Sequence, residues 1–392
     1  MEIKSLVKKY QADIQALRRL FHQYPELSFK EVETTKMIAA ELDKLKIPYK
    51  INPEKNTGLV AVIEGTMPGK KIALRSDIDA LNVTEESGVS FSSCHKGKMH
   101  ACGHDAHIAI LLGAAKILMD VREQINGTVY LIFQPAEELG QGSSYMMKFG
   151  DWFKQIDNIF GGHVWIDLPA GQVSVEEGER MAAGDQFTIK IHGHSGHGSQ
   201  PHQTTDAVVI ASAIVMNLQT IVSRHYNPLD SVAVTIASIH SGTRFNIIAG
   251  EAVMEGITRY FRRELGKDLK DTMERIIMNT AKAYGATAEF NYVPMIPPTI
   301  NDPASSKIAA AAVEKVLGKE HLSIMQKTTG GEDFAFYMNH KPGCFAFFGI
   351  YNPSINAVES HHSPKFNLDD TVLAGASGVY AQYAVDWLNT HK

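Results

Sequence analysis

The order of strand-like and helix-like segments changes near residue 184, and this change constrains the fold most. Before it, apolar strand-like runs at 58–65, 70–79, 127–138 and 158–165 are separated by helical stretches, the clearest at 107–121. Parallel strands need long crossover connections, which are usually helices. The alternation therefore predicts an α/β fold with a mostly parallel sheet whose faces are both covered.

Beyond residue 184 the segments follow the order β-α-β-β-α-β, the split βαβ arrangement of ferredoxin-like domains. Its first strand, QFTIKIHG (186–193), alternates apolar and polar side chains as a half-exposed strand does. After the Pro297-Pro298 break the earlier pattern resumes. We expect an α/β domain made of 1–183 and 296–392, with an α+β ferredoxin-like domain of 184–295 inserted into it.

Composition excludes several classes of protein. The net charge is -5 without a long run of one sign, which favours neither nucleic acid nor a membrane surface as a partner. The N-terminal segment has helical periodicity rather than the pattern of a signal peptide, and no stretch approaches the roughly 20 apolar residues of a membrane span. Three cysteines are too few for a secreted disulfide scaffold. A cytoplasmic protein is expected.

The segment 99–107, MHACGHDAH, carries the densest chemistry of the chain. The Cys102 thiol and the His104 imidazole lie close together just before an apolar helix, and both groups bind zinc-like divalent ions. By itself this cluster leaves two interpretations open, a metal site and a loop that is polar by chance.

Other ligand-type side chains follow predicted strands. Glu137 and Glu138 come directly after the 127–134 run, and His163 lies at the end of the next one. In open α/β sheets, sites form beyond the carboxyl ends of the strands. Neighbouring residues of an extended chain point in different directions, so one carboxylate can bind a metal while the other holds a water. The His361-His362 pair near the end of the chain is either an incidental turn or a further ligand.

These residues form a mixed set of thiolate, imidazole and carboxylate ligands. A closed structural zinc site is typically richer in cysteine. A spare glutamate beside the ligands suits a catalytic site, where metal ions polarise a carbonyl and lower the pKa of a water whose proton the glutamate takes.

Taken together, the motifs MHACGHDAH, FQPAEE (133–138) and GGH (161–163) resemble the amidohydrolase branch of the aminoacylase and carboxypeptidase superfamily of dinuclear metallohydrolases. That branch includes hippurate hydrolases, indole-acetyl-amino-acid hydrolases and N-acetyl-amino-acid deacetylases. The similarity runs from FHQYPELSFKE (21–31) to HHSPKF (361–366), nearly the whole chain.

The resemblance implies a role for each site residue. Glu137 corresponds to the general base, and Asp77 and Asp79 to residues that orient a ligand. Cys102 stands where other branches have a bridging aspartate. Two divalent ions per subunit are implied, manganese or zinc, with cobalt and nickel as alternatives. The implied metal ligands are Cys102, His104, Glu138, His163 and His362.

The 184–295 segment resembles the family's lid domain, which often forms homodimers or larger homo-oligomers. His197 corresponds to the histidine that steadies the tetrahedral oxyanion, often from the partner subunit. Asn246 and Arg259 match positions that hold the substrate's carbonyl or carboxylate, and an arginine suits a carboxylate because its planar fork binds both oxygens. Without the resemblance, His197 is equally a plain loop residue and Arg259 a surface arginine.

We therefore expect a metal-dependent hydrolase that cleaves the amide bond of small N-acyl amino acids. A dipeptidase or carboxypeptidase acting on short peptides is the main alternative. Two further hypotheses are a cysteine amidase with Cys102 as nucleophile and a non-catalytic protein that binds amino-acid conjugates. The intact Glu137 counts against the last, and the number of additional ligand-type residues counts against the cysteine amidase.

Overall fold

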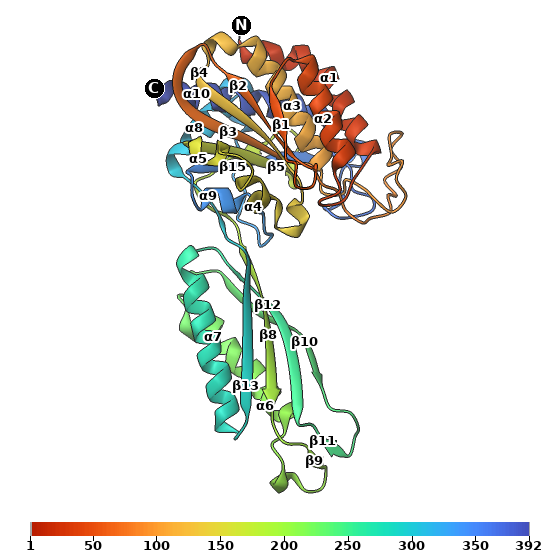
Figure 1. Cartoon of the computed structure of the whole chain (residues 1–392), viewed down its shortest axis with the longest axis vertical. Coiled ribbons are helices and arrows are strands. Elements are labelled where there is room, and N and C mark those ends of the chain that lie inside the picture. Colours follow the sequence, from red (N-terminus) through yellow and green to blue (C-terminus); the bar gives the residue numbers. More distant parts are fainter. Residues whose placement is uncertain (1, 392) are drawn as a thin grey trace. The chain divides into compact units, whose positions relative to one another are not determined.

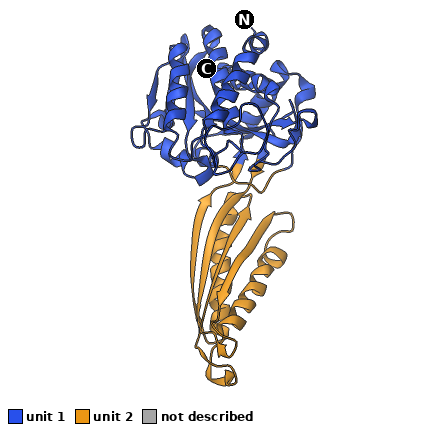
Figure 2. Ribbon diagram, turned by 90° about the vertical axis from the view of Figure 1, so that its right-hand side faces the viewer, with its two compact units in different colours: residues 1–178, 300–326, 333–392 blue, residues 179–299, 327–332 orange. Residues whose placement is uncertain are grey.

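The structure, a computed structural model, describes residues 2–391. The chain divides into two compact units, drawn in separate colours in Figure 2. Each unit has its own cluster of buried apolar side chains. Unit 1 consists of Met1–Gly178, Ile300–Gln326 and Asp333–Lys392, and unit 2 of Glu179–Thr299 and Lys327–Glu332.

A seven-stranded sheet with the order β1-β2-β4-β3-β5-β15-β6 forms the centre of unit 1. Its strands are β1 (Tyr49–Ile51), β2 (Leu59–Glu64), β3 (Met67–Asp77), β4 (Asn126–Gln134), β5 (Asn158–Pro169), β6 (Val173–Ser174) and β15 (Gly343–Tyr351). The central strands β4, β3, β5 and β15 are parallel to their neighbours within this group. The pairs at both edges are antiparallel. The predicted α/β fold with a mostly parallel central sheet is confirmed.

Helices pack on this sheet and on one another (Figure 1). The longer helices of unit 1 are α1 (Ile3–Gln23), α2 (Val32–Lys44), α3 (His104–Asp120), α8 (Pro303–Val316) and α10 (Leu373–Thr390). Nearly every residue of α3 and α10 is buried, and both helices contact α1 as well as β3. Helix α3 begins at His104, earlier than the predicted start at residue 107, so the Cys-Gly-His tripeptide leads directly into it.

A four-stranded antiparallel sheet with the order β10-β12-β8-β13 forms unit 2. Helices α6 and α7 contact this sheet and each other. Phe187, Ile189 and Ile191 alternate along β8 and are fully buried, as the half-exposed pattern of that segment predicts. In chain order the elements are β8 (Ala183–His192), α6 (Ala207–Thr220), β10 (Val232–Ser241), β12 (Glu251–Tyr260), α7 (Arg263–Ala283) and β13 (Thr287–Ile296).

One helical stretch of the described residues, Ala207–His225, is, with its 19 residues, long and apolar enough to cross a membrane by length and composition. The expectation that no stretch approaches such a length is wrong by this criterion. Ile210, Ile214 and Leu218 of the helix are buried in the apolar cluster of unit 2. Core helices of globular domains pass the same test, so the stretch by itself assigns no membrane role.

Candidate metal centre and active site

The ends of two neighbouring parallel strands position the acidic residues of the site. Asp77 and Gln134 are the last residues of β3 and β4 and lie opposite each other in the ladder. The loops that carry Asp79 and Glu137 therefore start side by side at one edge of the sheet. His163 lies inside β5, not at its end as predicted, because β5 continues to Pro169.

Residues from four distant segments meet beside these strand ends. Ligand-type atoms of Cys102, His104 and His163 lie within 4.8 Å of one another, and so do those of Cys102, Glu138 and His362. The Cys102 Sγ atom is 3.3 Å from His163 Nε2, and Glu138 Oε1 is 3.5 Å from His362 Nε2. Cys102 thus belongs to two adjacent groups, an arrangement that suits two cations with a shared thiolate.

Both buried histidines of the cluster direct the same nitrogen towards it. His104 Nδ1 donates to the backbone oxygen of Asp79 at 2.9 Å, and His163 Nδ1 donates to that of Val164 at 2.5 Å. A carbonyl oxygen only accepts hydrogen bonds, so Nδ1 carries the proton in each ring and Nε2 has a free lone pair. This is the orientation of metal-binding histidines.

The cluster also contains buried polar atoms without protein partners. Within residues 2–391, neither His104 Nε2 nor Glu138 Oε1 has a hydrogen-bond partner, although both atoms are buried. Leaving such groups unpaired costs about 1–3 kcal/mol each, more for charged ones. Their mutual distance is 3.9 Å. A cation between them would satisfy both atoms, so this donor set fits divalent metal ions.

The electrostatic environment of Cys102 points the same way. Burial raises the pKa of its thiol well above the usual range, and the negative charge of Glu138 raises it further. Burial likewise lowers the pKa of His163 well below its ordinary value, with the neighbouring His107 adding to the effect. A neutral imidazole is ready to bind a metal, whereas the thiol becomes a thiolate only when a bound cation offsets its burial.

Asp79 and Asp77, the two residues that the resemblance implies orient a ligand, are both buried next to the cluster. The Asp79 carboxylate accepts hydrogen bonds from the backbone amides of Glu137 and Glu138, each at 3.1 Å. Asp77 is bound to Arg75 at 2.8 Å and to His107 Nδ1 at 2.5 Å. Asp79 thereby holds the backbone beside the cluster, and Asp77 holds the side chains of Arg75 and His107.

Glu137 lies next to the group without belonging to the set around Cys102. Its carboxylate is within 4.8 Å of the ligand-type atoms of both His104 and Glu138. Its side chain is only partly buried. A base in this place can reach a water bound at the cluster while remaining open to a substrate.

His362 is the most exposed member of the set, with 55% of its side chain accessible. Its backbone has a positive φ of 68°, and its amide donates to the Ala101 oxygen at 2.8 Å. That hydrogen bond fastens the far end of the chain beside Cys102. The neighbouring His361 does not join the cluster; its Nε2 donates to the Val164 oxygen at 3.0 Å.

His107 was not assigned a role from the sequence. Its ring stacks on His104 and lies edge-on to His163, with centroid distances of 5.4 Å and 4.5 Å. Asp77 holds one of its nitrogens, and the other accepts the Val164 amide at 2.9 Å. The signal in the sequence was its spacing from His104, because residues three apart share one face of a helix.

The remaining predicted residues belong to unit 2. The exposed His197 lies on β9 (Gly196–His197), which pairs with β11 (Ile247–Ile248), and the Asn246 oxygen accepts the Gly198 amide at 2.9 Å. His197 Nδ1 accepts the Ser199 amide at 3.1 Å, so the proton of the neutral ring is on Nε2.

Arg259 lies at the opposite end of the unit 2 sheet from His197. It pairs with Gly184 at one end of β12, whereas Glu251 at the other end pairs with His192, close to β9 and β11 (Figure 1). The two ends of the strand are about 25 Å apart. Unit 2 therefore brings His197 and Asn246 together but keeps Arg259 away from both.

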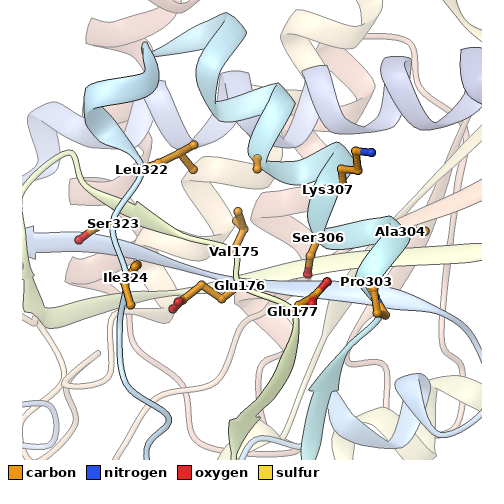
Figure 3. A pocket seen from close by; sticks show the side chains of 11 residues that line it. Val175, Glu176, Glu177, Pro303, Ala304, Ser306, Lys307, Leu322, Ser323 and Ile324 are labelled. Carbon is orange, nitrogen blue, oxygen red and sulfur yellow. The ribbon is translucent and has the colours of Figure 1, made fainter.

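Unit 1 also contains a cavity of about 600 Å³ between the start of α8, the segment after β6 and residues 322–324 (Figure 3). Val175, Ala310 and Leu322 give it a mostly apolar lining, with Glu177 and Lys307 at its border. None of the predicted site residues lines it.

Known proteins are similar to this chain in both sequence and fold. The sequence pattern of "Peptidase family M20/M25/M40" matches residues 73–386. The chain is 40% identical to the N-acetylcysteine deacetylase of Bacillus subtilis (strain 168), covering 96% of this chain and 97% of that protein. It is 37% identical to thermostable carboxypeptidase 1 of Saccharolobus solfataricus, covering 99% and 98%.

A crystal structure of a dinuclear metal binding peptidase of the M20 family from Bacillus subtilis has a TM-score of 0.87 and 36% identity to this chain. The alignment covers 98% of this chain and 99% of that one. Since the family pattern spans far more than half of the sequence and relatives align almost from end to end, the chain belongs to peptidase family M20/M25/M40 and is a metal-dependent hydrolase of C–N amide bonds.

Proposed function

We propose that this enzyme removes the acyl group from small N-acyl amino acids. Two divalent cations would be held by Cys102, His104, Glu138, His163 and His362, and Glu137 would act as the general base. The observation that carries the proposal is the sharing of Cys102 by two adjacent ligand groups, with the buried His104 Nε2 and Glu138 Oε1 atoms otherwise unpartnered.

Divalent cations held by these residues would supply Lewis acidity, which would polarise the scissile carbonyl and lower the pKa of the attacking water. Glu137 accepts the proton of that water and later donates it to the departing nitrogen. His197, whose Nε2 carries the ring proton, donates a hydrogen bond to the tetrahedral oxyanion. Asp79 keeps Glu137 and Glu138 in place through their backbone amides.

The proposed substrate class rests on the relatives of this chain and on the positive charge of Arg259. A deacetylase of an N-acyl amino acid is 40% identical to this chain over nearly its whole length. Asn246 would hold the substrate's carbonyl oxygen, and Arg259 would bind its carboxylate through two parallel hydrogen bonds. Because one relative is a carboxypeptidase, short peptides are the second candidate substrate class for this chain.

We also propose that unit 2 is a lid through which a homodimer or higher homo-oligomer forms. The support is the separation of about 25 Å between Arg259 and the end of the sheet that carries His197. A small acyl amino acid is much shorter than this distance. If both residues serve one substrate, they come from different copies of the chain.

A cysteine amidase with Cys102 as nucleophile is disfavoured by the raised pKa of its buried thiol, because the thiolate is the nucleophile. For the metal, we propose manganese or zinc, since thiolate, imidazole and carboxylate together suit such divalent ions. The three cysteines are all free, which supports a reducing, cytoplasmic location.

A hydrolysis screen tests the proposal. Acetyl, benzoyl and succinyl amino acids are compared with dipeptides, each with added manganese, zinc, cobalt or nickel. We expect the acyl amino acids to have the highest kcat/KM and exhaustive chelation to abolish turnover. Activity that survives chelation would point to the Cys102 nucleophile, and a preference for dipeptides would favour the second substrate class.

A Glu137→Gln variant tests the base. It should retain both metal equivalents, measured by elemental analysis, and lose at least about a hundredfold in kcat, as expected for a general base. Unchanged turnover in this variant would contradict the role of Glu137.

A further inference from the structure

The turn that carries Glu137 has an unusual backbone. We call residues 135–140 the base turn. Ala136 has a left-handed conformation, with φ 54° and ψ 42°, although it is not a glycine. Such a conformation costs on the order of 1 kcal/mol or more and persists only where surrounding contacts maintain it. The base turn therefore needs contacts that hold it in shape.

Two carboxylates supply those contacts. The Ala136 amide donates to Glu31 Oε1 at 2.9 Å, and the next two amides along the chain, those of Glu137 and Glu138, donate to Asp79. Three consecutive backbone N–H groups are thus held by acidic side chains. Asp79 is itself held by Ser28 Oγ at 2.6 Å.

Both Ser28 and Glu31 come from the connection between α1 and α2. This connection also pairs with the loop after β3, where the Ala80 amide donates to the Glu26 oxygen at 2.8 Å. The motif FHQYPELSFKE, which the proposed mechanism does not use, therefore makes hydrogen bonds to both the Asp79 loop and the base turn.

Glu31 is completely buried, and its second oxygen, Oε2, has no hydrogen-bond partner within residues 2–391. Burial, together with the negative charge of Asp79, raises its pKa to about 8. At neutral pH the side chain is therefore mostly a neutral carboxyl group, and a glutamine is its close match in shape and charge.

We propose that Glu31 is a positioning residue for the general base: by accepting the Ala136 amide it holds the base turn in the conformation that aims Glu137 at the attacking water. The inference rests on the proposed role of Glu137. Without the acceptor, the Ala136 amide loses its hydrogen bond, while the Ala136 oxygen still accepts the Gln141 and Gly142 amides, and the turn relaxes on the amide side of Ala136. Glu138 remains held at its own amide by Asp79, so metal binding persists.

The test compares Glu31→Ala and Glu31→Gln in the metal-loaded enzyme. Glu31→Ala should lower kcat by about 10- to 100-fold, because a displacement of about 1 Å has an effect of that size, while KM and metal content stay near wild-type values. Glu31→Gln keeps an oxygen acceptor of the same reach, so its kcat should stay within about threefold of wild type.

Glu26→Ala is the matched control. Glu26 lies in the same connection, and its carboxylate also accepts a backbone amide, that of Thr34 at 2.8 Å, but at the start of α2. This variant should lose some thermal stability and keep its kcat. If Glu31→Ala does not fold, Glu31→Asp replaces it, because its shorter side chain does not reach the Ala136 amide.

The inference is wrong if Glu31→Ala turns over like wild type, if Glu31→Gln is as impaired as Glu31→Ala, or if the loss of kcat follows a loss of metal. Glu137→Gln is measured in parallel. Full activity in Glu137→Gln overturns the proposed base itself. An inactive Glu137→Gln beside a fully active Glu31→Ala overturns only the role of Glu31.

Discussion

At the scale of single residues, the nitrogen that carries the ring proton decides what each histidine can bind. The hydrogen bonds of His104 and His163 to carbonyl oxygens leave Nε2 of each ring free towards Cys102. The bond from the Ser199 amide to His197 has the opposite consequence and leaves a proton on Nε2. The Nε2 atom of histidine therefore offers a lone pair in unit 1 and an N–H group in unit 2.

His197→Ala should lower kcat by about 10²- to 10³-fold, the usual effect of removing one donor to an oxyanion. Metal content and thermal stability should be unchanged, since His197 is exposed. His202→Ala, a change at a nearby exposed histidine, serves as control and should keep full activity. Steady-state kinetics of both variants decide the matter, and equal rates for His197→Ala and His202→Ala would rule out the oxyanion role.

The buried Glu31 carboxyl should make stability depend on pH. Its pKa is about 8 in the folded chain against an ordinary 4.5, so between these values the native state binds the extra proton. Stability therefore falls as pH rises from about 4.5 to about 8, by a few kcal/mol at most. Denaturant unfolding at saturating metal should show this slope in wild type and a flatter one in Glu31→Gln. Parallel slopes would contradict it.

At the scale of elements, a buried cluster of charged side chains connects helix α1 to the start of α3. Arg18 is 2.9 Å from Asp105, and His22 is 2.8 Å from the same carboxylate. Although burial alone would raise the Asp105 pKa, Arg18 and His22 hold it well below its usual range. Asp105 thus serves the packing of α1 on α3, and the proposed ligand His104 is the first residue of the helix that this contact stabilises.

Arg18→Leu should therefore destabilise the fold by about 3–5 kcal/mol, the usual result of removing one partner of a buried ion pair. Lys36→Ala is the control, because its pair with Glu33 is exposed on both sides and contributes about 1 kcal/mol or less. Urea unfolding of the two variants measures the difference. Equal midpoints would show that the buried pair does not hold α1.

At the scale of the whole molecule, the chain combines an α/β unit that holds the candidate metal centre with an inserted unit that carries His197, Asn246 and Arg259. The length of the β12 strand separates the last of these from the other two. One copy of unit 2 therefore does not bring all three to one small substrate, and the proposed oligomer follows from this separation.

Mixing two inactive variants tests that arrangement. Glu137→Gln and His197→Ala chains are combined under conditions that exchange subunits. If His197 acts on the partner's site, half of the randomly formed dimers are mixed and one of their two sites is intact, so about one quarter of wild-type activity returns. A mixture that stays as inactive as its components would show that His197 serves its own chain.

Much of the fold was predictable because periodicity is a local property of the sequence. The alternating strands and helices before residue 184 predict the parallel centre of the sheet, and the antiparallel edge pairs formed by β1 and β6 were not foreseen. Those edge strands have only three and two residues, too few to show a period. The placement of His163 was wrong because the predicted strand stopped at residue 165, whereas β5 continues to Pro169, where Pro169 and Gly171 mark its end.

The sequence by itself determined which side chains are present for the chemistry and in which order they occur, because a thiol, an imidazole or a carboxylate keeps its ligand character in any fold. Only the tertiary structure decided that Cys102 is shared by two groups, that His107 and Glu31 support the centre, and that Arg259 is far from His197. Such relations depend on strand order, register and burial, which arise from contacts between residues far apart in the chain.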